Sequence, residues 1–311
     1  MTVTQPFVHE ALLYASEEEF LGATVPFVNE GVEAGEPVLI VVRPEREQAL
    51  RVSLRDSTLV SFADMIEIGR NPSRIIPVWH QHVADSAAHG GRCRGIGEPV
   101  WPGRTEAELA ECHRHEALLN LAFADTPGFR LLCPYDTAEL DPQVIERACC
   151  THPYVETHAG RCESDRYLGL EAATMPFDER LADPDPEAHE FALDRASLPM
   201  LRNVVWGWAS AAGIDVARTA DVVLAVHELA TNTLRHGEGR GTVRAWKSPS
   251  AFVFEVHDGG RIDDPLAGRR RPVPDAEGGR GLWLVNQLCD LVELRSSAAG
   301  TVVRMQIAVR G

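Results

Sequence analysis

Short apolar runs alternate with helical stretches through the first 133 residues, and this alternation limits the fold more than any other feature of the sequence. Residues 37–42 form a continuous apolar run, which is typical of a strand buried on both faces. Residues 17–34 and 104–123 have the pattern of helices. Alternating strands and helices predict a mostly parallel sheet with helices on both faces, so we expect an α/β fold for this half.

A segment rich in proline and aspartate, residues 174–188, interrupts the regular pattern. Such a composition is typical of a domain boundary, and a chain of 311 residues is long enough for two domains. We therefore expect an N-terminal domain over residues 1–173, a linker over 174–188 and a C-terminal domain over 189–311. Residues 163–173 are expected to form a helix that ends the first domain or connects the two.

The pattern of the C-terminal half predicts helices on one face of a mostly antiparallel sheet, which is a two-layer α+β fold. Helices are expected over residues 198–212, 219–235 and 282–290. The second of these helices carries an apolar stripe that should face the core, formed by Val222, Val226, Leu229 and Thr233.

The same helix carries a second, polar stripe. Glu228 and Asn232 are four residues apart, so their side chains lie on the same helix face. A carboxylate and a carboxamide at this spacing can bind a hydrated Mg²⁺ ion, because Mg²⁺ prefers a few protein oxygens together with water and phosphate. A solvated helix face would have the same pattern.

Two glycine motifs follow downstream. Residues 253–260 are expected to form a strand that ends in Asp258, Gly259 and Gly260. Residues 278–285 form a glycine turn that opens a helix. Glycines at the start of a helix let the backbone approach a phosphate, and the free N–H groups there favour anions.

The order of these motifs resembles the GHKL ATPase superfamily, which has the Bergerat fold. The motifs are E-x-x-x-N at residues 228–232, D-x-G at 258–260 and G-x-G-L at 279–282. Within the superfamily, the E-L-A-T-N…R-H-G and G-R-G-L-W-L-V segments resemble the anti-sigma-factor serine kinases of the RsbW type. The resemblance covers about residues 188–309.

The resemblance implies ATP and Mg²⁺ as cofactors and gives each motif residue a role. Asn232 should ligate Mg²⁺ through its amide oxygen. Glu228 should act as general base toward a serine hydroxyl or water. Asp258 should accept a hydrogen bond from the adenine amine, and Gly260 should let the base approach the backbone.

The phosphates should lie at the turn formed by Gly279, Arg280, Gly281 and Leu282. Arg235 either contacts phosphate or is a solvated helix end, and the sequence favours neither interpretation. The superfamily often has D-x-G-x-G, and Ile262 stands at the last position here. The polar segment 261–277 falls where the family has its ATP lid.

The N-terminal half lacks both G-x-x-x-x-G-K-[ST] and a G-x-G-x-x-G motif after a strand, so nucleotide binding is not expected there. Its H-E-A-L-L-Y-A-S…F-V-x-x-G-x-x-x-G-E-P-V-L-I-V text resembles the start of the MEDS sensory domain, a degenerate P-loop-like fold. The later R-H-E-A-L-L-N and L-L-C-P-Y-D segments fit the same family. The resemblance implies a sensor or docking domain.

Cysteines and histidines gather in this half without a recognisable spacing. There is no C-x-x-C pair and no H-x-x-x-H. We therefore interpret them as packing cysteines and surface histidines; redox sensing by a thiol would require a low pKa. The residues concerned are Cys93, Cys112, His113, His115, Glu116, Cys149, Cys150 and His152.

The formal net charge of −16 opposes direct binding to nucleic acid. No apolar run is long enough to span a membrane, and the first residues do not form a signal peptide. The seven cysteines have no disulfide-scaffold spacing. We therefore expect a cytoplasmic protein with reduced thiols, without nucleic-acid or membrane partners.

Taken with the resemblance, these features predict an ATP-dependent anti-sigma factor that is also a protein serine/threonine kinase. It would phosphorylate an anti-anti-sigma partner of the STAS type and sequester a sigma factor, under the control of its sensory domain. The alternative is an ATP-loaded binding switch that sequesters a regulator without kinase turnover. The resemblance also implies a homodimer formed through the kinase domain.

Overall fold

The computed structural model describes residues 6–173, 180–273 and 279–309. The chain divides into two compact units, Met1–Ala173 and Thr174–Gly311. Residues 174–179 of the expected linker lie outside the described residues, whereas residues 180–188 belong to the second unit. The division into residues 1–173, 174–188 and 189–311 therefore stays a proposal.

A seven-stranded sheet forms the centre of the first unit, in the order β3-β2-β4-β5-β1-β6-β7. Every neighbouring pair is parallel except β6 and β7, which are antiparallel. This arrangement confirms the mostly parallel α/β fold. The strands are β1 (Val8–Tyr14), β2 (Val38–Val42), β3 (Val60–Asp64), β4 (Cys93–Gly97), β5 (Phe129–Asp136), β6 (Tyr154–Thr157) and β7 (Gly160–Glu163).

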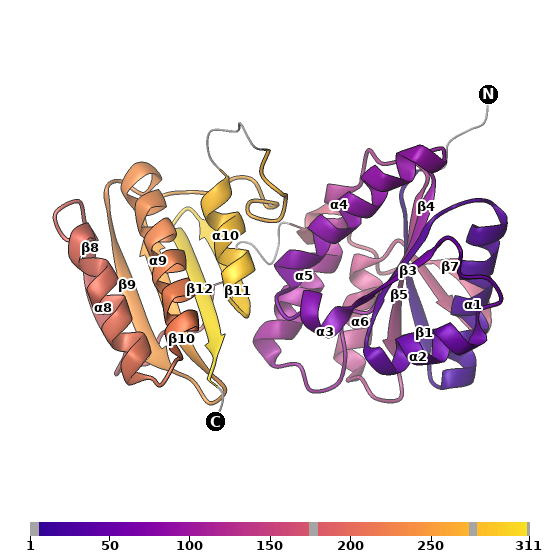
Figure 1. Cartoon of the computed structure of the whole chain (residues 1–311), viewed down its shortest axis with the longest axis horizontal. Helices are drawn as coiled ribbons and strands as arrows, with labels where there is room; N and C mark the ends of the chain where they lie inside the picture. Colours follow the sequence, from indigo (N-terminus) through magenta and orange to yellow (C-terminus); the bar gives the residue numbers. More distant parts are fainter. Residues whose placement is uncertain (1–5, 174–179, 274–278, 310–311) are drawn as a thin grey trace. The chain divides into compact units, whose positions relative to one another are not determined.

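Helices lie on both sides of this sheet (Figure 1). Local capping sets where they begin. The hydroxyl of Ser16 accepts from the backbone N–H of Glu19, and Thr105 and Glu108 form a reciprocal capping box. The helices are α1 (Glu17–Glu33), α2 (Pro44–Ser53), α3 (Met65–Ile68), α4 (Ile75–Ser86), α5 (Glu106–Ala122) and α6 (Pro142–Thr151).

The end of the first unit differs from the expected helix over residues 163–173. The hairpin of β6 and β7 adds two strands to the sheet, and only Gly169–Ala173 forms a short 3₁₀ helix. Both strands have four residues, and all four residues of β7 are exposed. Such a short polar strand has no apolar alternation by which to recognise it.

The second unit is a two-layer α+β domain, as expected. Its five strands pair antiparallel throughout in the order β11-β12-β10-β9-β8. The strands are β8 (His189–Asp194), β9 (Arg240–Lys247), β10 (Ala251–Asp258), β11 (Leu291–Ser297) and β12 (Gly300–Ala308). One face carries three helices (Figure 1), which are α8 (Leu198–Ala211), α9 (Val216–His236) and α10 (Arg280–Leu288).

The core of the second unit lies between these helices and the sheet. Alternation along β10 decides which side chains enter it. Phe254 and Val256 pack in the core together with Val226 and Leu229 of α9, whereas Glu255 and His257 point to the other face of the sheet. Among the described residues, no helix has the length and apolar character needed to cross a membrane.

Candidate functional site

Helix α9 holds the predicted metal and base residues at the edge of its buried stripe. The side chain of Asp215 caps the helix by accepting from the N–H of Arg218. Leu229 is buried in the core, while Glu228 and Asn232 are half-buried beside it. The two polar side chains therefore face a partly open region above the core.

The start of α10 lies against the same two side chains. A Cβ on Gly281 would lie 3.2 Å from Oε2 of Glu228 and 3.0 Å from Nδ2 of Asn232, so any larger residue would have to displace one of these side chains. The preceding Gly279 has a φ of 76°, in the left-handed region that favours glycine. The start of α10, where a helix presents backbone N–H groups, thus lies close to a carboxylate and a carboxamide.

A small pocket of about 40 Å³ adjoins this region and is lined by residues of α9, β10, α10 and β12 and by Ile262. It contains Asp258 and Asn232 together with apolar walls, which is a composition suited to a planar base with one polar edge. The lining residues are Leu229, Asn232, Thr233, Val256, Asp258, Ile262, Leu282, Thr301 and Val303.

Asp258 is fixed at the end of β10 by two hydrogen bonds. Its Oδ2 accepts from the hydroxyl of Thr233 at 2.6 Å, and its Oδ1 accepts from the N–H of Gly260 at 2.8 Å. Each carboxylate oxygen still has acceptor capacity for a ligand. The sequence pattern placed Thr233 in the apolar stripe of α9, and its hydroxyl partner 25 residues away could not be read from that pattern.

Ile262, which replaces the last glycine of the superfamily motif, lines the same pocket. A chain of hydrogen bonds holds the segment around it. The N–H of Ile262 donates to Oγ of Ser296 at 2.8 Å, the two hydroxyls of Ser296 and Thr301 lie 2.9 Å apart, and Thr301 donates to the carbonyl of Gly260 at 2.9 Å. Ser296 and Thr301 were missed because no local motif marks them.

The two predicted arginines both lie on the exposed surface of the domain. Arg235 is exposed in the last turn of α9, and Arg280 is exposed at the first residue of α10. In the expected lid, the carbonyl of Gly268 accepts from Nδ2 of Asn286 at 2.9 Å and Arg269 is buried. Residues 274–277 of that lid lie outside the described residues.

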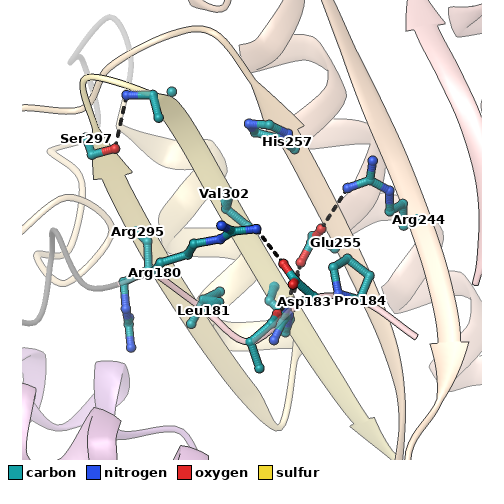
Figure 2. A pocket seen from close by; sticks show the side chains of 14 residues that line it. Arg180, Leu181, Asp183, Pro184, Arg244, Glu255, His257, Arg295, Ser297 and Val302 are labelled. Atoms are coloured by element: carbon teal, nitrogen blue, oxygen red, sulfur yellow. Dashed lines mark hydrogen bonds and ion pairs between the residues drawn. The ribbon is translucent and has the colours of Figure 1, made fainter. Parts of the chain in front are cut away.

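A larger hollow of about 630 Å³ lies on the opposite face of the same sheet (Figure 2). Residues 180–184 form one wall, and Arg304 donates to the carbonyl of Ala182 at 2.7 Å. Glu255 pairs there with Arg304 at 2.7 Å and with Arg244 at 3.4 Å. This hollow contains none of the residues in the three glycine and carboxylate motifs.

The three histidines of this set are not on the surface, which corrects the interpretation from sequence. His113, His115 and His152 are all buried. Burial raises the pKa of Cys112 to about 12 and that of Cys93 to about 11, so neither thiol has the low pKa that redox sensing requires.

Two family models match this sequence. Residues 8–153 match the MEDS domain, described as the methanogen/methylotroph DcmR sensory domain. Residues 191–307 match the histidine kinase-like ATPase domain. The chain is therefore a MEDS domain joined to a histidine kinase-like ATPase domain, and both domain resemblances found in the sequence are confirmed. The second domain is one of an ATP-binding class.

Among solved structures, the RsbU and RsbW domains of Rv1364c from Mycobacterium tuberculosis match with 20% identity and a TM-score of 0.30, over 40% of this chain and 33% of that one. This chain thus spans about a third of that protein's length. The NMR structure of the histidine kinase domain of the E. coli osmosensor EnvZ matches with 20% identity and a TM-score of 0.25, over 42% of this chain and 92% of that one. No match is found among curated proteins. At these TM-scores, neither structure carries an argument about function.

Proposed function

We propose that the C-terminal domain binds ATP with Mg²⁺ and phosphorylates a serine on a STAS-type anti-anti-sigma partner, while its ATP-bound form sequesters a sigma factor. The observation that carries this proposal is the close approach of Gly281, at the start of α10, to both Glu228 and Asn232. The partner assignment rests on the resemblance of the motif text to anti-sigma-factor kinases of the RsbW type.

The chain's own groups fit Mg²⁺ and ATP. Asn232 offers an amide oxygen next to the N–H groups of α10, so a metal held there would also meet phosphate oxygens. Asp258 would orient the adenine amine in the small pocket. When bound, Mg²⁺–ATP supplies the electrophilic γ-phosphoryl group.

Glu228 would remove the proton from the attacking serine hydroxyl. Its Oε2 lies close to Gly281, in the turn that we propose binds phosphate, and a general base near that turn would be within reach of a nucleophile that attacks the γ-phosphate. The alternative, a binding switch without turnover, would use the same pocket and Asn232 but would not require the basicity of Glu228.

The test is Glu228→Gln, which keeps the shape of the side chain and removes its basicity. We expect ATP binding and sigma-factor binding to persist, and phosphoryl transfer to fall by about 10²–10⁴-fold. Asn232→Ala should lose both nucleotide binding and transfer, because it removes the Mg²⁺ ligand. The measurement is transfer from labelled ATP to candidate partners that carry a phosphorylatable serine.

Asp221→Asn is the matched control, because Asp221 lies on the same helix and pairs with Arg218 away from the pocket. It should leave both activities unchanged. Transfer by Glu228→Gln at the wild-type rate would show that this carboxylate is only a solvated helix residue. Absence of transfer in the wild type with retained ATP-dependent sigma binding would favour the switch.

A further inference from the structure

Four side chains of metal-binding type meet inside the N-terminal domain, although the sequence separates them widely. They are His9 on β1, Glu116 on α5, Cys133 on β5 and His152 directly after α6. All four are buried, with exposed fractions of 1% or less, and their ligand atoms lie within 4.8 Å of one another. The topology explains the meeting, because β1 lies between β5 and β6, α6 packs against β1, and α5 packs against α6.

The tautomer of His9 follows from its neighbours. The side-chain amide of Asn120 donates to the carbonyl of Thr151 at 2.7 Å, which turns its Oδ1 toward Nδ1 of His9 at 3.1 Å. An amide oxygen can only accept, so Nδ1 of His9 carries the proton. Its Nε2 therefore presents a lone pair, 3.0 Å from Oε2 of Glu116.

His152 is oriented in the same way by a different carbonyl. Its Nδ1 lies 2.8 Å from the backbone oxygen of Ala148, and this oxygen can only accept. Nε2 of His152 therefore also presents a lone pair, 3.4 Å from the same Oε2 of Glu116. Metal-binding histidines characteristically donate their other ring N–H to a carbonyl or carboxylate, as both rings do here.

The cluster therefore has more acceptors than protons. Cys133 Sγ lies 3.4 Å from Nε2 of His9 and 3.6 Å from Oε2 of Glu116, and its single S–H can serve only one of them. Lone pairs that converge in a buried site are unfavourable unless a proton or a metal ion lies between them, and a metal ion can serve all four ligand atoms at once. With metal–ligand bonds of about 2.0–2.3 Å, the edges of a tetrahedral site are roughly 3.3–3.8 Å, close to these separations.

We propose that His9, Glu116, Cys133 and His152 bind one Zn²⁺ ion in a closed tetrahedral site. Mixed nitrogen, sulfur and oxygen ligands suit Zn²⁺, whereas Mg²⁺ and Ca²⁺ take oxygen. On binding, the Cys133 thiol loses its proton to solvent and a sulfur–zinc bond forms. The thiolate and the Glu116 carboxylate then balance the two charges of the ion.

The surroundings support the ligands. The hydroxyl of Tyr135 donates to the second carboxylate oxygen of Glu116 at 3.3 Å, which leaves Oε2 for the metal. Four protein ligands fill a tetrahedral site, so no position is left for a substrate or water. The ion would therefore tie β1 and β5 to α5 and the end of α6, which makes it structural or regulatory for the sensory domain.

The decisive measurement uses the full wild-type chain, reduced, stripped with chelator and free of nucleotide. Titration with Co²⁺ as the probe should saturate at one equivalent, with the visible absorption of tetrahedral cobalt and a sulfur-to-cobalt charge-transfer band. One equivalent of Zn²⁺ should abolish both, and excess Mg²⁺ should abolish neither. Absence of these bands in the folded wild-type chain would overturn the proposal. This measurement requires no variant.

Variants then assign the ligands. Cys133→Ala should lose the charge-transfer band, and His9→Gln should weaken Co²⁺ binding by more than about 100-fold, beyond the usual effect of an outer-sphere change. Cys112→Ala is the matched control, because Cys112 is equally buried on α5 but lies outside the cluster, where it donates to the carbonyl of Pro99. It should keep the band. A band that survives Cys133→Ala and disappears in Cys112→Ala would refute the assignment.

Discussion

Asp258 shows how tightly a single acceptor is held in the predicted nucleotide site. Both of its oxygens already accept one hydrogen bond, from Thr233 and from Gly260, so the carboxylate cannot rotate without losing one. The side chain therefore has its orientation fixed before a ligand binds. Binding then costs little further side-chain entropy at this residue.

The first prediction concerns this carboxylate. Asp258→Asn should weaken ATP binding by about 1–3 kcal/mol, or roughly 5–150-fold, because the amide presents donors where Thr233 and the adenine amine also donate. Isothermal titration calorimetry measures the change. His257→Asn is the control, since His257 lines the hollow on the opposite face of the sheet (Figure 2). Equal ATP affinity of Asp258→Asn and wild type would remove Asp258 from the site.

A second prediction tests the space beside Asp258. A Cβ on Gly260 would lie 2.7 Å from the carbonyl oxygen of His236 and 2.9 Å from Oδ1 of Asp258. Gly260→Ala should therefore displace the carboxylate and lower ATP affinity at least as far as Asp258→Asn does. Gly207→Ala is the control, because no atom lies within 4 Å of the added Cβ in α8, and it should stabilise the helix by about 0.5–1 kcal/mol. Thermal unfolding with and without ATP separates the two effects.

The third prediction concerns the pH dependence of the N-terminal domain. Burial, followed by the charge of Arg147, lowers the pKa of His113 to about 4. Since the unfolded chain binds this proton near pH 6.5 and the folded chain does not, stability is complete above that pH. It should fall by up to about 3 kcal/mol as the pH drops from 6.5 toward 4.

His113→Leu should remove this share of the pH dependence. Neither ring nitrogen of His113 has a hydrogen-bond partner among the described residues, so the apolar replacement leaves no partner unpaired. Denaturant unfolding at several pH values measures the slope. A slope between pH 6.5 and 4 that is identical in the variant and the wild type would show that another group, such as the half-buried His82, whose pKa is also lowered by desolvation, dominates.

At the scale of elements, the periodicity of apolar residues predicted the buried faces of helices. It did not predict how helices pack against one another, nor the short strands. The apolar stripe of α9 predicted its buried face, and the spacing of Glu228 and Asn232 predicted their shared face. The close approach of Gly281 to both could not be predicted, because it depends on how α10 packs against α9. The hairpin of β6 and β7 was missed because its strands are too short for a pattern.

The outer face of the C-terminal sheet gives a fourth prediction. Glu255 is nearly buried and pairs with Arg304, which is also largely buried. Glu255→Gln should destabilise the ATPase domain by about 3 kcal/mol, because a desolvated guanidinium loses its counter-charge. Glu190→Gln is the control: Glu190 also pairs with Arg244, yet 59% of its side chain is exposed, and the loss should stay below about 1 kcal/mol. Urea unfolding compares them, and equal effects would contradict the role of burial.

At the scale of the whole molecule, the sequence predicted two domains but not the buried cluster in the first. Glu116 and His152 were noted in the sequence, yet nothing joined them to His9 and Cys133, because only the pairing of β1 with β5 and β6 brings these positions together. A metal-ligand motif can be recognised in a sequence when its ligands lie a few residues apart, and here they are dispersed over two strands, one helix and the residue that follows another helix.

The fifth prediction concerns where the second domain begins. The carbonyl of Ala182 accepts from Arg304, and residues 180–184 cover part of the outer sheet face. A fragment of residues 180–311 should therefore be more stable than one of residues 189–311, by about 1–3 kcal/mol for the lost acceptor and the uncovered surface. Thermal unfolding of both fragments tests this, and equal stability would place the boundary at residue 189.

The crowding around Asp258 has a consequence for how sequences of relatives should be interpreted. A Cβ on Gly237 would lie 2.5 Å from the carboxylate carbon of Asp258, and one on Gly241 would lie 2.6 Å from the carbonyl oxygen of His257. Neither glycine needs to touch a ligand to be intolerant of replacement. We therefore expect both glycines to be invariant in an alignment of homologues for steric reasons alone. A mutational scan that measures only activity will not distinguish these glycines from residues that act on the substrate.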